Sequence, residues 1–324
     1  MLILKDQIDF KIIDNLVCGG AGFLGSHLID SLLAKGENVI CIDNLLTGKI
    51  ENINHLKNNN KFSFINHDVI EPIKSEIPID KIWHLACPAS PFYYQKDPLL
   101  TIRINYEGTF NILNLAKDFQ SKLLFTSTSE VYGSTQVSPQ NEDMLINIST
   151  YSPRACYSEG KRIAETLVQV FGKVNKLQTR LARVFNTYGP RLNINDGRVI
   201  SNFINQSLRN EKLTVYGDGS QTRSFCYVQD MVCGLIKLMD SDYSMPINLG
   251  NEQEITILDL ALLIRSKINN IISLEYCNLP TDDPMFRKPC MDLAKNQLDW
   301  YPKINLSEGL DKTIDFLRSS YKKN

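Results

Sequence analysis

Residues 15–25 read Asn-Leu-Val-Cys-Gly-Gly-Ala-Gly-Phe-Leu-Gly, an apolar run that leads directly into a cluster of glycines. The run Asn15–Cys18 has the continuous apolar character of a strand buried on both faces, and Leu24–Lys35 has the pattern of a helix. Glycine in the turn between them allows a tight change of direction and close packing of the helix on the strand. The stretch therefore predicts the first strand–turn–helix unit of a parallel α/β fold.

The same alternation continues through the first half of the chain. Further strands are predicted at Asn38–Asp43, Phe62–Asp68, Lys81–Ala86, Lys122–Ser129 and Leu181–Phe185, and further helices at Leu99–Asp118 and Ala155–Val174. Strands that alternate with helices in this way form a parallel sheet that is covered on both faces. We therefore predict an α/β protein built on a doubly wound parallel sheet of the Rossmann type.

The regular alternation ends after Asn186. Loops are marked by Gly189-Pro190, Asn195-Asp196-Gly197 and Gly217-Asp218-Gly219, and helices are predicted near Val199–Arg209, Ile257–Asn269 and Ser307–Arg318. The helix Met231–Met239 and the strand Pro246–Leu249 are expected to return to the main sheet. This organisation predicts a Rossmann domain at residues 1–186, with 231–250 returning to it, and a smaller mixed α/β substrate lobe at 187–230 and 251–324.

Composition narrows the classes of function. The 324 residues are 43% hydrophobic, which is enough for a sizeable core, and the net charge of -1 argues against a general nucleic-acid binder. No run reaches the roughly 20 apolar residues that span a bilayer, so no membrane association is expected. The eight cysteines form no CxxC pair and the four histidines lack ligand spacing. We therefore expect no metal and a reducing, cytoplasmic compartment.

The glycine cluster is a candidate dinucleotide site. Its members are Gly19, Gly22 and Gly25 with Phe23 and Leu24, at the start of a helix whose free N–H groups attract phosphates. Asp43 ends the second strand, 18 positions after Gly25, where a carboxylate accepts the adenosine ribose hydroxyls and repels a ribose phosphate. NAD is therefore favoured over NADP, with Asn44 beside Asp43 and Asp68 as a candidate for the adenine edge. In the alternative, Asp43 is a turn or cap residue.

Tyr157 and Lys161 are the candidate catalytic pair. They lie four positions apart, so on a helix they share one face. A lysine ammonium near the phenol, beside a cationic nicotinamide ring, would lower the tyrosine pKa and make Tyr157 a base for a sugar hydroxyl. The strand before this helix runs into Thr128, Ser129 and Glu130, which are expected at the ligand-binding ends of the strands. The alternative for these three is a polar turn with Glu130 in solvent.

Together these motifs resemble the extended short-chain dehydrogenase/reductases that act on nucleotide sugars (the NAD-dependent epimerase/dehydratase family). More closely, they are similar to the UDP-glucuronate decarboxylase (UDP-xylose synthase) family. The resemblance covers nearly the whole chain from about Asn15, and its matching stretches are Gly19–His27, His84–Pro91, Thr126–Gly133, Arg154–Arg162, Ala182–Arg191, Asp196–Phe203, Gln221–Phe225 and Asp282–Pro289. The glycine and Tyr/Lys motifs mark only the superfamily, whereas Thr128-Ser129-Glu130 with the proline-rich segment is more specific.

The resemblance implies a reaction. Tyr157 would start oxidation of sugar carbon 4, and the carboxylate of UDP-glucuronate, now β to a ketone, would leave as carbon dioxide before the ketone is reduced to give UDP-xylose. Thr128 and Ser129 would bind the reacting sugar, Glu130 would handle a proton at carbon 5, and Arg223 would hold the carboxylate or assist reprotonation. Related 4,6-dehydratases carry Asp-Glu where this chain has Ser129-Glu130, and a second carboxylate would disfavour a glucuronate ligand.

The resemblance also implies substrate contacts. Asn186, Arg198, Arg223 and Arg287 would bind the diphosphate side, with Val199 beside them, because arginine suits phosphate. Tyr216 would frame the uracil, and Ser90 and Tyr94 would close over the sugar. Ser158, Ser152 and Cys290 depart from the family pattern without removing a catalytic group.

Several alternatives stay open. The enzyme alternatives are a UDP-sugar 4-epimerase, a 4,6-dehydratase and an oxidative decarboxylase that releases a UDP-4-keto-pentose, and the other class is a redox-sensing or scaffold protein that has lost its chemistry. A homodimer is implied by the resemblance, with the helices Leu99–Asp118 and Ala155–Val174 forming a four-helix interface. Alternatively, the apolar positions of these helices face only their own sheet.

Overall fold

The computed structural model describes residues 2–4, 10–133, 137–145, 148–279 and 285–321. Within these residues the centre of the protein is a seven-stranded sheet in which all neighbouring strands are parallel. In order across the sheet the strands are β13 (Pro246–Leu249), β8 (Thr179–Val184), β7 (Lys122–Thr128), β6 (Ile79–His84), β2 (Ile13–Cys18), β3 (Val39–Asp43) and β4 (Phe62–Asn66). Strand order reverses at β2, so the predicted doubly wound Rossmann sheet is confirmed.

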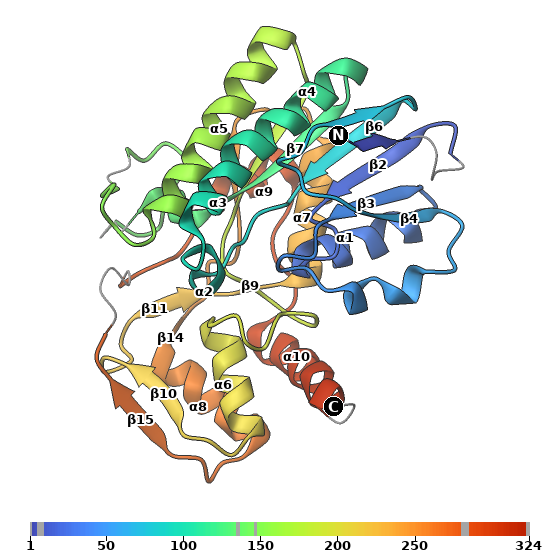
Figure 1. The fold of residues 1–324 in the computed structure, drawn as a ribbon. Coiled ribbons are helices and arrows are strands. Elements are labelled where there is room, and N and C mark those ends of the chain that lie inside the picture. Colours follow the sequence, from blue (N-terminus) through green and yellow to red (C-terminus); the bar gives the residue numbers. More distant parts are fainter. Residues whose placement is uncertain (1, 5–9, 134–136, 146–147, 280–284, 322–324) are drawn as a thin grey trace.

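Alternation along the strands places a core on each face of this sheet. One core joins the sheet to α1 (Phe23–Ala34) and α7 (Val228–Asp240) and contains Val17, Trp83 and Leu124. The other joins it to α4 (Thr109–Phe119) and α5 (Ala155–Asn175) and contains Leu16, Ile82 and Leu123. Figure 1 shows these helices on opposite sides of the sheet. Burial of consecutive side chains explains why the strands read as continuous apolar runs.

The predicted strands are present, with ends that shift by at most two residues. Asp68 and Ser129 therefore lie just beyond β4 and β7 rather than inside them. The short strand β1 (Leu2–Leu4) pairs in parallel with β5 (Ile73–Ser75). No helix in the described part of the chain combines the length and the apolar character that crossing a membrane requires.

One predicted helix is interrupted. The segment expected as a single helix over Leu99–Asp118 consists of α3 (Pro98–Arg103), a π turn η3 (Ile104–Gly108) and α4. Asp97 caps the start, because its Oδ1 accepts a hydrogen bond from the N–H of Leu100 (2.9 Å). Residues that suit an α-helix also suit one π turn, so spacing in the sequence does not reveal the extra residue. Such turns occur often at functional sites.

The second lobe follows β8 and lies below the sheet in Figure 1. It contains three small strand pairs, β9 (Thr187–Tyr188) with β12 (Cys226–Tyr227), β10 (Leu213–Tyr216) with β15 (Leu274–Cys277), and β11 (Thr222–Ser224) with β14 (Glu254–Thr256). Its helices are α6 (Val199–Leu208), α8 (Ile257–Ile268) and α10 (Leu306–Tyr321). The mixed α/β character and the return of β13 to the main sheet are as predicted.

The boundary between the lobes differs in detail from the predicted one. The returning helix α7 begins at Val228 rather than Met231. The helix α9 (Asp292–Leu298) packs against β13 and α7, so this part of residues 251–324 belongs with the Rossmann sheet. Trp300 secures it by donating from Nε1 to the backbone oxygen of Asp230 (3.1 Å).

Candidate active site

A cavity of about 810 Å³ lies at the carboxyl ends of the central strands, between the sheet and the second lobe. This is where ligands bind in doubly wound sheets, because the strand order reverses there. Its wall contains every predicted cofactor, catalytic and substrate residue except Tyr94, together with residues that the sequence prediction did not single out. The fold thus brings residues that are far apart in the chain to one cleft.

The glycine loop fits the phosphates of a dinucleotide. A Cβ on Gly25 would lie 2.2 Å from the backbone oxygen of Gly19, so Gly25 is required by packing of helix on loop. A Cβ on Gly22 would approach only that oxygen, at 3.1 Å, and Gly22 faces the cavity. The helix α1 begins at Phe23 with no acidic residue in its first turn and no side-chain cap from the residues described. Its N–H groups therefore face the cavity without a built-in anion.

Asp43 holds the glycine loop as a turn residue and also lines the cavity, while its contact with a ribose stays a prediction. It is only 8% exposed at the end of β3, where its Oδ2 accepts from the N–H of Ala21 (3.0 Å) and its Oδ1 from the N–H of Leu45 (2.8 Å). Burial raises the pKa of the Asp43 carboxyl, and these N–H groups oppose the shift. The carboxylate ties the glycine loop to the next strand and also lines the cavity. Beside it, Asn44 Nδ2 donates to Asp68 Oδ2 (2.7 Å).

Tyr157 and Lys161 lie on one face of α5, and both are buried. The Lys161 ammonium donates to the backbone oxygen of Thr126 (2.8 Å) and lies 4.6 Å from the centroid of the Phe125 ring. Burial lowers the pKa of Lys161. Burial also raises the pKa of Tyr157, although a hydrogen bond with Thr128 opposes that shift. The predicted lowering of this pKa depends on a cationic nicotinamide ring as well as on Lys161, so it stays a prediction.

Glu130 faces the cavity with two partners, on the 3-10 turn η4 (Ser129–Tyr132) that follows β7. Thr128 caps this turn, its Oγ1 accepting from the N–H of Glu130 (3.2 Å). The Glu130 Oε2 accepts from the Tyr94 hydroxyl (3.2 Å), and its Oε1 lies 4.0 Å from Arg154 Nη1. Glu130 is therefore held by neighbouring groups, and the alternative of a solvated turn residue is not supported.

Ser129 has a cationic neighbour from the second lobe. Nη1 of the buried Arg287 donates to Ser129 Oγ at 3.3 Å. Arg223 also lines the cavity, but its Nη1 donates to the backbone oxygens of Thr222 (2.8 Å) and Met285 (3.4 Å). Arg287 therefore contacts the predicted catalytic turn. The stretch Asp282–Pro289 lies outside the described residues as far as Pro284.

Tyr94 differs from its prediction. It was expected to close over the sugar, but it is fully buried and lies behind the cavity wall. The reason is the helix α2 (Pro91–Tyr94), which turns the side chain of Tyr94 inward against Tyr157 while Tyr93 lines the cavity. Adjacent aromatic residues gave no signal in the sequence of which one would face the ligand.

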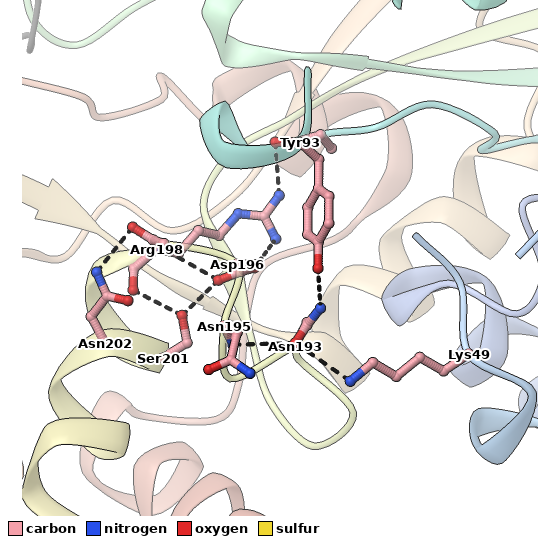
Figure 2. Close-up of polar contacts among 10 residues, drawn as sticks. Lys49, Tyr93, Asn193, Asn195, Asp196, Arg198, Ser201 and Asn202 are labelled. Carbon is pink, nitrogen blue, oxygen red and sulfur yellow. Dashed lines mark hydrogen bonds and ion pairs between the residues drawn. The ribbon is translucent and has the colours of Figure 1, made fainter. Parts of the chain in front are cut away.

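Hydrogen bonds connect three segments at the cavity (Figure 2). Asn193 Nδ2 donates to the Tyr93 hydroxyl (2.7 Å), and Lys49 Nζ donates to Asn193 Oδ1 (3.4 Å). Arg198 donates from Nη2 to the backbone oxygen of Ala89 (2.9 Å) and from Nη1 to Asp196 Oδ2 (3.1 Å). These bonds link the loop after β9 to the segment around α2 and to the loop after β3. The predicted substrate residue Arg198 is therefore partly engaged within the protein.

The remaining predicted substrate residues are Ser90, Asn186, Val199 and Tyr216, and all line the cavity. Ser90 Oγ is buried and has no hydrogen-bond partner within the described part of the chain. Arg191 was missed as a site residue. Its Nη2 pairs with Asp30 Oδ2 (2.7 Å), whereas its Nη1 is buried and, as far as the described residues go, lacks a hydrogen-bond partner. The only sequence signal for it was its place in the matched stretch Ala182–Arg191.

Known proteins resemble the chain over most of its length. A family model described as GDP-mannose 4,6 dehydratase matches residues 16–313. UDP-glucuronic acid decarboxylase 1 of Arabidopsis thaliana is 49% identical over 304 residues, which cover 94% of this chain and 69% of that protein. UDP-glucuronic acid decarboxylase 1 of Danio rerio is 49% identical over 301 residues, which cover 93% of this chain and 72% of that protein.

Solved structures agree with the fold. The UDP-glucuronic acid 4-epimerase of Bacillus cereus, in complex with UDP-glucuronic acid and NAD, has a TM-score of 0.84 and 28% identity, covering 95% of this chain and 100% of that chain. The UDP-glucose 4-epimerase of Thermotoga maritima with UDP-glucose has a TM-score of 0.86 and 27% identity, covering 95% of this chain and 99% of that chain. Both similarities extend through the second lobe as well as the Rossmann sheet.

Proposed function

Because this chain belongs to the NAD-dependent epimerase/dehydratase family and, within it, to the UDP-glucuronic acid decarboxylases, we propose that it converts UDP-glucuronate to UDP-xylose and carbon dioxide. NAD is the proposed cofactor, held by Gly22 and the N-terminus of α1 at its phosphates and by Asp43 at its ribose. When bound, it would accept a hydride from sugar carbon 4 and return it after decarboxylation. The overall reaction therefore consumes no cofactor.

Tyr157 is the proposed base for the hydroxyl on carbon 4. Its phenol interacts with Thr128, which lines the same cavity and would share the sugar hydroxyl. Lys161 is fixed beneath it by the backbone oxygen of Thr126. Since burial raises the pKa of the Tyr157 phenol, the proton leaves most easily when positive charge lies close by. We therefore propose that Lys161 binds the cofactor and supplies positive charge near the phenol, and that Tyr157 transfers the proton.

Ser129, Glu130 and Arg287 are the proposed groups around carbon 5. Once carbon 4 is a ketone, the bond from carbon 5 to the carboxylate carbon breaks, and its electron pair is delocalised into the ketone oxygen as carbon dioxide leaves. A proton must then add to carbon 5, and Glu130 is the titratable group of the turn that lines the cavity. The ketone is finally reduced at carbon 4. The hydride removed from carbon 4 thus returns to it, and the proton added at carbon 5 replaces the lost carboxyl group.

The observation that carries this proposal is the contact between Arg287 and Ser129 (3.3 Å). A cation at this position suits a substrate that carries a carboxylate, whereas an aspartate in place of Ser129 would repel it. The arrangement therefore favours loss of the carboxyl group over the elimination of water by a 4,6-dehydratase.

Product identification tests the function. Purified protein is incubated with UDP-glucuronate and a catalytic amount of NAD, and the nucleotide sugar is identified by NMR while carbon dioxide is measured. UDP-xylose with one equivalent of carbon dioxide is expected, and Tyr157→Phe should abolish it. A C4 epimer that keeps its carboxylate would assign a 4-epimerase, and a keto-pentose with stoichiometric NADH would assign an oxidative decarboxylase. Bound cofactor without any turnover would indicate a scaffold protein.

A homodimer is also proposed. The helices α3, α4 and α5 expose large apolar side chains, among them Leu99 (74%), Val174 (73%) and Val170 (55%). Exposed apolar positions on adjacent helices support the four-helix interface expected from the family. Light scattering after size-exclusion chromatography should give twice the chain mass of 36.9 kDa, and the chain mass itself would contradict the proposal. The cytoplasmic location stays a prediction from cysteine usage.

A further inference from the structure

Tyr94 contacts both of the groups that the proposed reaction needs for proton transfer. Its ring is stacked on that of Tyr157, with centroids 4.7 Å apart and an angle of 2° between the planes. Its hydroxyl donates a hydrogen bond to Glu130 Oε2 at 3.2 Å. The side chain is 0% exposed and does not belong to the cavity wall. It therefore acts on these two residues from behind and does not touch the ligand.

Tyr94 is itself fixed from two other elements. Its backbone oxygen accepts a hydrogen bond from Thr101 Oγ1 on α3 (3.1 Å). The same oxygen accepts a weaker one from Cys156 Sγ at the start of α5 (3.6 Å). Because α5 also carries Tyr157, the stacked rings are held at both their backbones. A parallel stack between rings fixed in this way restrains rotation of the Tyr157 ring about its own axis.

The hydrogen bond to Glu130 determines where that carboxylate points. Oε2 is taken by the Tyr94 hydroxyl, and Oε1 lies toward Arg154 at 4.0 Å. Burial, followed by the charge of Glu130, raises the pKa of Tyr94, so the phenol stays a hydrogen-bond donor throughout the working pH range. The hydroxyl therefore remains a donor to Glu130 Oε2 and holds that carboxylate in one orientation.

We propose that Tyr94 is a positioning residue that aligns Tyr157 by stacking and Glu130 by a hydrogen bond, so that the proton-transfer groups at carbons 4 and 5 of the sugar keep a fixed relation. This inference rests on the proposed function of the site. Two separable contacts follow from it, one through the ring and one through the hydroxyl. Tyr94→Phe removes only the hydroxyl, whereas Tyr94→Leu removes the ring as well.

The test measures kcat and KM for UDP-glucuronate in the enzyme with NAD. For Tyr94→Phe, kcat should fall about tenfold, as expected for loss of a hydrogen bond to a charged group, while KM changes less than about twofold. A lowered kcat with a nearly unchanged KM is the readout that a merely structural role of Tyr94 would not produce. Tyr94→Leu should lower kcat by about another tenfold, because Tyr157 loses its stacking partner.

The matched control is Tyr132→Phe. Tyr132 is also buried, lies on the same turn as Glu130 and donates its hydroxyl to Asn248 Oδ1 (2.7 Å), but it does not line the cavity. The Tyr132→Phe variant should lower thermal stability and leave kcat within about twofold of the wild-type value. A purely structural role of Tyr94 would likewise change stability and leave kcat unmoved.

The outcomes separate the two proposals. If the wild-type protein releases no carbon dioxide from UDP-glucuronate, the proposed function fails. If the wild type is active and Tyr94→Phe keeps the wild-type kcat, the role of Tyr94 is overturned while the function stands. Tyr94→Phe keeps the packed ring, so its result remains decisive even if Tyr94→Leu does not fold.

Discussion

Acid should destabilise this protein through one buried histidine. His84 ends β6, is 1% exposed and shares a hydrogen bond with Thr109 Oγ1 through Nε2 (3.1 Å). Burial, followed by the charge of Lys161, lowers the pKa of His84 to about 3. In the unfolded chain the same group has a pKa of about 6.5. The folded protein therefore disfavours protonation of His84, partly because of the nearby charge of Lys161.

The sign and size of the effect follow from proton linkage. Between the two pKa values the unfolded chain binds a proton that the folded protein does not, so the free energy of unfolding falls as pH falls. His84 contributes its full stability above pH 6.5, and the loss is complete near pH 3. For one site with these pKa values, stability at pH 5 is about 2 kcal/mol lower than at pH 7.

The assay is urea unfolding at pH 7 and pH 5, followed by circular dichroism. His84→Gln keeps a polar atom near Thr109 but cannot titrate, so its loss of stability between the two pH values should be about 2 kcal/mol smaller than that of the wild type. If His84→Gln and the wild type lose the same free energy, the reasoning is refuted.

Further tests address the glycine loop and the support beneath the active site. Gly22→Ala should weaken NAD binding by roughly tenfold and change the melting temperature little, since Gly22 lines the cavity and its Cβ would meet only the Gly19 oxygen, at 3.1 Å. Gly25→Ala should lower the melting temperature by several degrees, since its Cβ would lie 2.2 Å from that oxygen. Equal behaviour of the two variants in titration and melting would contradict this assignment. Glu165→Gln should lower the free energy of urea unfolding by roughly 3–5 kcal/mol, because it leaves the buried Arg183 guanidinium without its ion pair (2.9 Å). A loss below about 1 kcal/mol would show that Arg183 is compensated elsewhere.

Sequence patterns did not predict the π turn Ile104–Gly108 or the exact boundary of the second lobe. Both depend on how helices pack, and helical spacing is the same on either side of Ile104–Gly108. The predicted lowering of the Tyr157 pKa counted the charges of Lys161 and of a nicotinamide ring, whereas the desolvation that raises this pKa in the protein alone is visible only in the fold. Burial depends on the whole fold, so the four-residue spacing between Tyr157 and Lys161 does not reveal how deeply the phenol is buried.

What the sequence by itself determined is the Rossmann sheet, the glycine loop with Asp43, and the residues of the catalytic motif. These features depend on local periodicity and on backbone conformations that few residue types can adopt. Both signals can be recognised within short stretches of sequence. The tertiary structure alone decided that Arg287 contacts Ser129 and that Tyr94, rather than its neighbour Tyr93, turns inward onto Tyr157. Those contacts join residues up to 158 positions apart. Their geometry is set by how two lobes and several helices pack around one cleft.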